Sequence, residues 1–71
     1  MIRINKKGRI SKGDLSGQYV LIQDDAENTG GYLILTATDI DFQQGHDDWV
    51  EDMTALERYF KESQWQIEWL D

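Results

Sequence analysis

The sequence predicts an α+β domain in which a small antiparallel sheet of four to five strands carries a single helix on one face. Short β-branched and aromatic runs, separated by Gly, Asn and Asp, predict the strands. A later segment changes to helical periodicity. With 71 residues the chain is sufficient for one domain, 1–71, with one modest core. Residues 1–8 form an N-terminal arm that can be flexible.

Three strands are expected in the first half of the chain, at 9–12, 19–23 and 32–38. The segment 24–31 is rich in Asp, Asn and Gly, which supply the positive φ angles and side-chain hydrogen bonds of a chain reversal. The segment 13–17 contains two glycines and serves as the first turn. The three strands are therefore expected to form an antiparallel meander.

The helix is predicted over 54–63. Thr54 and Glu57 have the spacing of a capping box, in which each side chain bonds to a backbone N–H at the helix start. Leu56 and Phe60 follow at the spacing of one apolar helix face. These features predict an amphipathic helix that packs on the sheet.

The segment before the helix allows two interpretations. Asp48 could cap a longer helix, because Trp49 and Met53 would extend its apolar stripe upstream. We favour a short strand over 47–51, because a Trp–Val pair between acids is typical of a sheet edge.

The last strand is expected at 65–69, where apolar and polar residues alternate. Trp65, Ile67 and Trp69 then share one face of the sheet and should pack against Leu56 and Phe60 of the helix.

Charge is strongly segregated along the chain. Five of the seven Lys and Arg residues lie within the first thirteen positions, whereas all fourteen Asp and Glu residues follow them. The net charge of −7 disfavours nucleic acids and anionic membrane surfaces as partners and favours cationic ones. No apolar stretch approaches the roughly 20 residues needed to span a bilayer. We therefore expect neither nucleic-acid nor membrane binding.

Enzymatic activity is not expected. His46 is the only histidine and cysteine is absent, so a nucleophilic triad has few components available. A domain of this size also has little room to enclose a substrate groove. The lack of cysteine suits a reducing compartment, so the expected location is cytoplasmic.

The acidic segment 39–52 allows a metal-binding alternative, because hard cations prefer carboxylate oxygens. Its glycine and glutamate miss the EF-hand positions by one residue each. A looser calcium-like cage could also recruit acids of the 24–31 turn, namely Asp24, Asp25 and Glu27. Apart from this alternative, no metal or cofactor is expected.

The segment 39–52 also combines acids with two aromatic residues, Phe42 and Trp49. An aromatic contact surrounded by charge is typical of a protein interface. We expect Trp49 to be at least half buried and Phe42 to be the more exposed of the two. The candidate protein-binding residues are Asp39, Asp41, Phe42, Asp47, Asp48 and Trp49.

These features predict a small acidic, non-catalytic module that binds a basic protein surface, as a monomer or weak homodimer. In size, charge and expected fold the chain resembles the small acidic antitoxin or immunity proteins of bacteria, which block basic toxins such as nucleases. A further alternative is a self-associating structural domain, in which the basic arm of one copy meets the acidic face of another.

Overall fold

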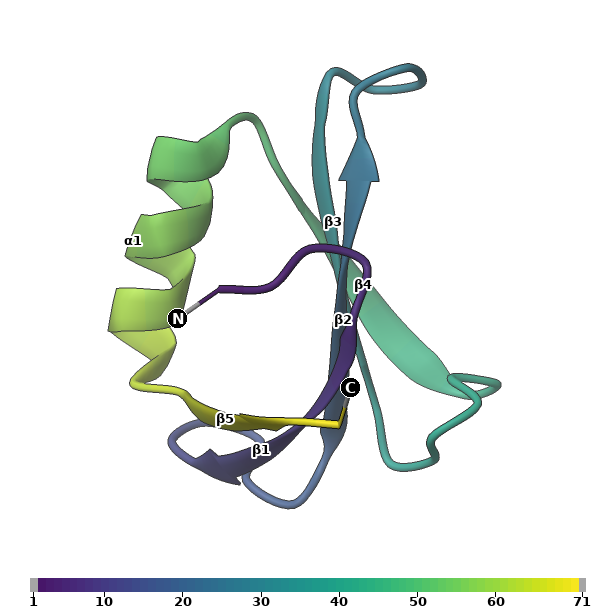
Figure 1. The fold of residues 1–71 in the computed structure, drawn as a ribbon, viewed down its shortest axis with the longest axis vertical. Coiled ribbons are helices and arrows are strands. Elements are labelled where there is room, and N and C mark those ends of the chain that lie inside the picture. The colour runs from purple at the N-terminus through teal and green to yellow at the C-terminus, as the bar shows by residue number, and fades with distance from the viewer. Residues whose placement is uncertain (1, 71) are drawn as a thin grey trace.

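The computed structural model describes residues 2–70, so Met1 and Asp71, the ends of the predicted domain, lie outside the described residues. The α+β prediction is confirmed: one helix packs on one face of a five-stranded antiparallel sheet (Figure 1). The elements are β1 (Lys7–Lys12), β2 (Tyr19–Asp25), β3 (Gly31–Ala37), β4 (Gly45–Val50), α1 (Met53–Ser63) and β5 (Gln66–Trp69).

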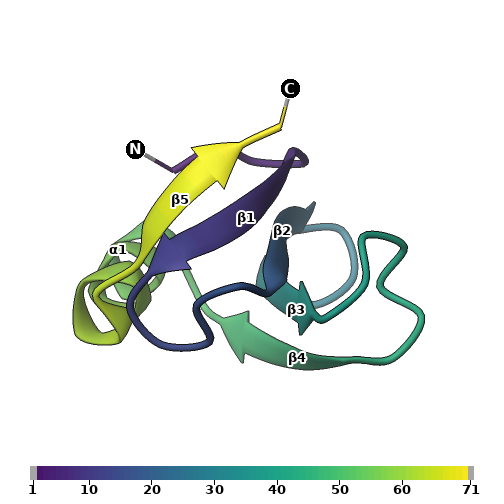
Figure 2. The ribbon, with the colours of Figure 1, turned by 90° about the horizontal axis from the view of Figure 1, so that it is seen from below.

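The strands follow one another in the order β4-β3-β2-β1-β5, as Figure 2 shows. The first three strands form the predicted meander, and β4 extends it at one side. The helix then carries the chain across one face of the sheet, so that β5 pairs with β1 at the opposite edge. This crossover makes β4 and β5 the two edge strands.

The core lies between α1 and the sheet. Its fully buried side chains are Ile10, Val20, Ile22, Ile34 and Leu56. Trp65 closes one end, where its ring makes edge-on contacts with Tyr59 and Phe60 at centroid distances of 5.5 and 5.2 Å. Ile67 and Trp69 also pack against the core, as their alternation predicts.

Close packing at β1 depends on Gly8, which lies opposite Trp69 in the register. A Cβ atom at this position would lie 2.9 Å from Trp69 Cε3. Of the predicted arm 1–8, Lys7 and Gly8 belong to β1, and Ile2 and Ile4 pack against the core.

The predicted capping box is wrong in detail. The helix begins at Met53, and its cap is Asp52, whose carboxylate accepts a 2.8 Å hydrogen bond from the Ala55 N–H. Asp52 has an extended backbone, so its side chain can turn back onto the first helical turn, and Thr54 is already helical. The segment upstream is a strand, as favoured, because Gly45–Val50 pairs with β3 along its length.

Candidate functional site

Strand alternation divides the residues of β4 between the two faces of the sheet. Asp47 lies opposite Leu35 and Trp49 opposite Leu33, on the face that the helix leaves uncovered, here called the open face. Asp48 lies opposite Ile34, a core residue, and therefore points to the helix side. The six candidate residues thus do not form one continuous patch.

Asp48 is engaged within the fold. Its carboxylate accepts a 2.7 Å hydrogen bond from the Tyr59 hydroxyl and lies 3.4 Å from His46 Nε2. Partial burial, followed by the hydrogen bond to Asp48, raises the pKa of Tyr59 to about 12. Asp48 therefore ties β4 to the helix, which is a structural role.

Asp39 is also used internally. Its carboxylate accepts a 3.1 Å hydrogen bond from the Gln43 N–H, and its backbone oxygen accepts one from the Phe42 N–H. The Gln43 bond is the main cause that holds the pKa of Asp39 below its usual value. Asp39 thereby shapes the 38–44 loop between β3 and β4.

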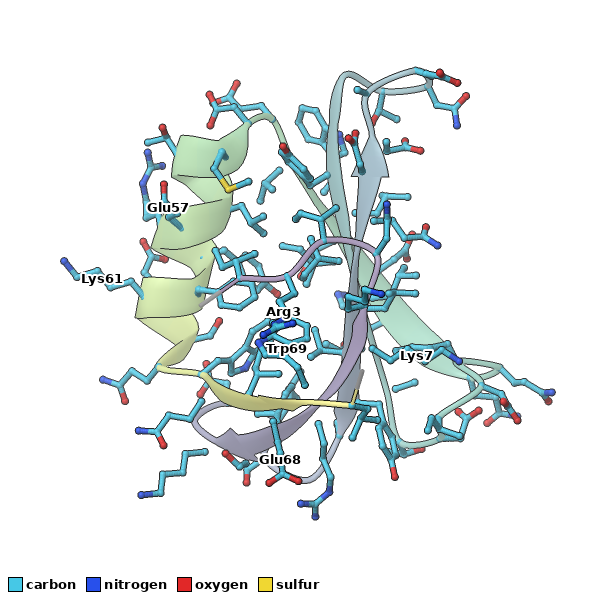
Figure 3. All side chains as sticks on the ribbon, viewed as in Figure 1. Arg3, Lys7, Glu57, Lys61, Glu68 and Trp69 are labelled. Carbon is cyan, nitrogen blue, oxygen red and sulfur yellow. The ribbon has the colours of Figure 1, made fainter. Side chains whose placement is uncertain are left out.

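The 38–44 loop is joined to the open face through Lys7. The Lys7 ammonium donates a 3.0 Å hydrogen bond to the Ile40 carbonyl and lies 5.6 Å from the centre of the Phe42 ring. Figure 3 shows Lys7 reaching away from the helix toward this loop. Phe42, Leu35 and Asp47 share an open hollow of about 220 Å³ beside the loop.

Phe42 has an unfavourable backbone conformation for an aromatic residue. Its φ angle is +55°, in the left-handed region that non-glycine residues avoid at a cost of about 1–2 kcal/mol. Strain of this kind often occurs at binding loops, where a particular side chain is needed. Trp49 is 49% exposed and thus about half buried, as expected, but the expected order is reversed because Phe42 is the less exposed of the two.

Trp49 is exposed but held in place. Its Nε1 donates a 2.8 Å hydrogen bond to the Thr29 hydroxyl in the turn between β2 and β3. Gly31 makes this position possible, since a Cβ atom there would lie 2.7 Å from the indole nitrogen. The indole is therefore a fixed apolar surface at the end of the open face.

The open face has an apolar centre with opposite charges at its two sides. One row across the sheet reads Asp47, Leu35, Leu21 and Lys7, from β4 to β1. Sequence alone does not show which residues lie on the open face. Its apolar centre could have been predicted, however, because β3 carries Leu33 and Leu35 as well as the core residue Ile34, so both faces of this strand are apolar.

The Lys and Arg residues of the first thirteen positions do not neutralise the acids by direct contact. Within residues 2–70 no Lys or Arg side chain contacts a carboxylate, and the one close contact between a basic and an acidic side chain joins His46 and Asp48. Asp41 and Asp47 are exposed, and they remain available to a partner together with Phe42 and Trp49.

Across residues 2–70, no three His, Asp or Glu side chains converge as metal ligands would, so the acids of the two loops form no cage. In the same range, no helix has the length and apolar character needed to cross a membrane. No family model, curated protein or solved structure matches the chain.

Proposed function

We propose that this protein is a small acidic binding module that recognises a basic protein surface through its open face and the 38–44 loop. The observation that carries the proposal is that Asp47 and Trp49 lie on the open face, that Phe42 shares a hollow with Asp47, and that Asp41 is exposed in the adjoining 38–44 loop. A non-catalytic role in the cytoplasm, by blocking a cationic partner as antitoxin or immunity proteins do, fits this arrangement.

The acids and the aromatic residues have different tasks in this proposal. Exposed carboxylates raise the association rate of a cationic partner, and salt screens this effect over about 8 Å. The aromatic surfaces of Phe42 and Trp49 become buried on contact and slow dissociation. Asp39 and Asp48 support the loop and strand that present these groups.

The test compares three immobilised baits: the wild type, a site variant (Asp41→Asn with Asp47→Asn), and a control variant (Glu57→Gln with Glu62→Gln). Both variants lose two charges, but the control acids are exposed on the helix, which covers the opposite face of the sheet (Figure 1). The wild type and control should capture the same basic proteins from a native lysate, and the site variant should not.

A captured protein is then purified and titrated against each variant. The site variant should associate more slowly and with a weaker dependence on salt than the control, and Phe42→Ala should dissociate faster than the wild type. Equal kinetics for the site and control variants would contradict the proposal.

A further inference from the structure

We propose that a basic segment of the partner binds in extended form along the free edge of β4 and adds a sixth strand to the sheet. This inference rests on the proposed function and specifies how the partner is held. It starts from the position of β4 in the sheet.

β4 is an edge strand of six residues, and among the strands of residues 2–70 its one partner is β3. In an antiparallel edge strand, alternate residues direct their N–H and C=O groups away from the sheet, where an added strand can bond to them. The other edge, β5, has four residues, and its pairing with β1 is interrupted by a register shift between Ile10 and Lys12. The β4 edge therefore offers the longer regular template.

The side chains of β4 define the chemistry of the added strand. Asp47 and Asp48 are adjacent and point to opposite faces, so each would meet one of two adjacent residues of the incoming segment. Opposite charges favour Lys or Arg at both positions, because the Asp48 side chain stays 42% exposed while it accepts the Tyr59 hydrogen bond. The next residue would lie beside Trp49, whose exposed indole suits an aliphatic or arginine side chain. A pair of adjacent basic residues is thus the expected recognition element.

Charge disfavours a second copy of this chain as the occupant. Two antiparallel β4 edges would bring Asp47 and Asp48 of one copy close to the same acids of the other. Pairing of β4 with β5 would bring them toward Glu68, and β5 carries no Lys or Arg. Like charges on neighbouring strands are destabilising, so the edge is suited to a cationic strand from another molecule.

The probe is a capped synthetic peptide of alternating Thr and Val around a central Lys–Arg pair. Two further versions carry N-methyl groups on alternate residues, one on the odd and one on the even positions. All three peptides have the same charge, but an N-methyl group removes a backbone donor. Only one set of donors can face β4, so one methylated peptide should bind like the parent and the other at least tenfold more weakly.

Affinity is measured by calorimetry, and the binding edge by amide hydrogen exchange of the full chain. The parent peptide should slow exchange within Gly45–Val50 and leave Gln66–Trp69 unchanged. Asp47→Asn with Asp48→Asn should weaken the parent peptide at least tenfold, whereas Glu57→Gln with Glu62→Gln should not. Asparagine at 48 can still accept the Tyr59 hydrogen bond, which limits damage to the fold.

Equal binding of all three peptides would overturn strand addition, because the peptides would then be attracted by charge alone. The same conclusion would follow if no peptide bound but the captured basic protein still bound through Asp41 and Asp47. In both cases the proposed function would still hold. Slowed amide exchange in β5 instead of β4 on peptide binding would also overturn the inference. So would slowed exchange in β4 without peptide, if sedimentation showed that the protein is then a dimer. Failure of the proposed function is seen separately, in the comparison of site and control baits.

Discussion

The left-handed backbone of Phe42 predicts an unusual order of stability for two substitutions. Phe42→Ala and Phe42→Gly both remove the ring, and with it the Lys7 contact of about 0.5–1 kcal/mol. They also lose partial apolar burial of about 1 kcal/mol. Alanine retains the Cβ atom that opposes a φ of +55°, whereas glycine does not.

Relief of this strain is worth about 1–2 kcal/mol, which exceeds the usual cost of about 0.5–1 kcal/mol for glycine relative to alanine. We therefore expect Phe42→Gly to be more stable than Phe42→Ala by about 0.5–1 kcal/mol. For a domain of this size that corresponds to several degrees in Tm.

Urea and thermal unfolding followed by circular dichroism measure the difference. The matched control is Glu68, an exposed residue within β5 that is not among the positive-φ residues of the chain. At position 68 the glycine variant should be the less stable of the two, so that Glu68→Gly unfolds more easily than Glu68→Ala. An alanine variant at position 42 as stable as the glycine variant would refute the argument from strain.

Three further substitutions test the framework that presents the site. Leu56→Ala should destabilise the protein by about 2–5 kcal/mol in urea unfolding, because Leu56 is the fully buried side chain of the helix; a loss below about 1 kcal/mol would contradict this packing. Gly8→Ala should cost about 1–3 kcal/mol, since its Cβ would lie 2.5 Å from Ile67 Cγ2 and 2.9 Å from Trp69 Cε3, and an unchanged Tm would argue against the close approach. The pKa of Tyr59, raised to about 12, favours the neutral phenol in the folded state, so its contribution is complete below about pH 10 and is lost as pH rises toward 12. The wild type should therefore lose more stability than Tyr59→Phe between pH 10 and 12, and parallel curves would exclude this linkage.

Much of the fold was predictable because local patterns and tertiary packing agree. The alternation of Ile67 and Trp69 is that of β5, which begins at Gln66, one residue later than predicted, and the stripe containing Leu56 is the buried side of α1. The cap was misplaced because Asp52 and Thr54 are both suitable capping residues. Only the backbone conformation determined which of them was used.

The candidate site was predictable only in outline. The sequence identifies 39–52 as acidic and aromatic, but it does not show which carboxylates are engaged within the fold. Asp48 bonds to Tyr59 and Asp39 to Gln43, while Asp47 faces solvent. Those partners depend on register and loop conformation, which are set by contacts between distant segments.

The sequence by itself determined the order of strands and helix and the segregation of charge, because periodicity, turn residues and composition are local properties. Only the tertiary structure decided that Lys7 reaches the 38–44 loop, that Asp47 and Asp48 face opposite ways, and that β4 is left as a free edge. The physical reason is that strand order and register are chosen by burial of the whole core. A shift of one residue in β4 would exchange its two faces while leaving the sequence pattern unchanged.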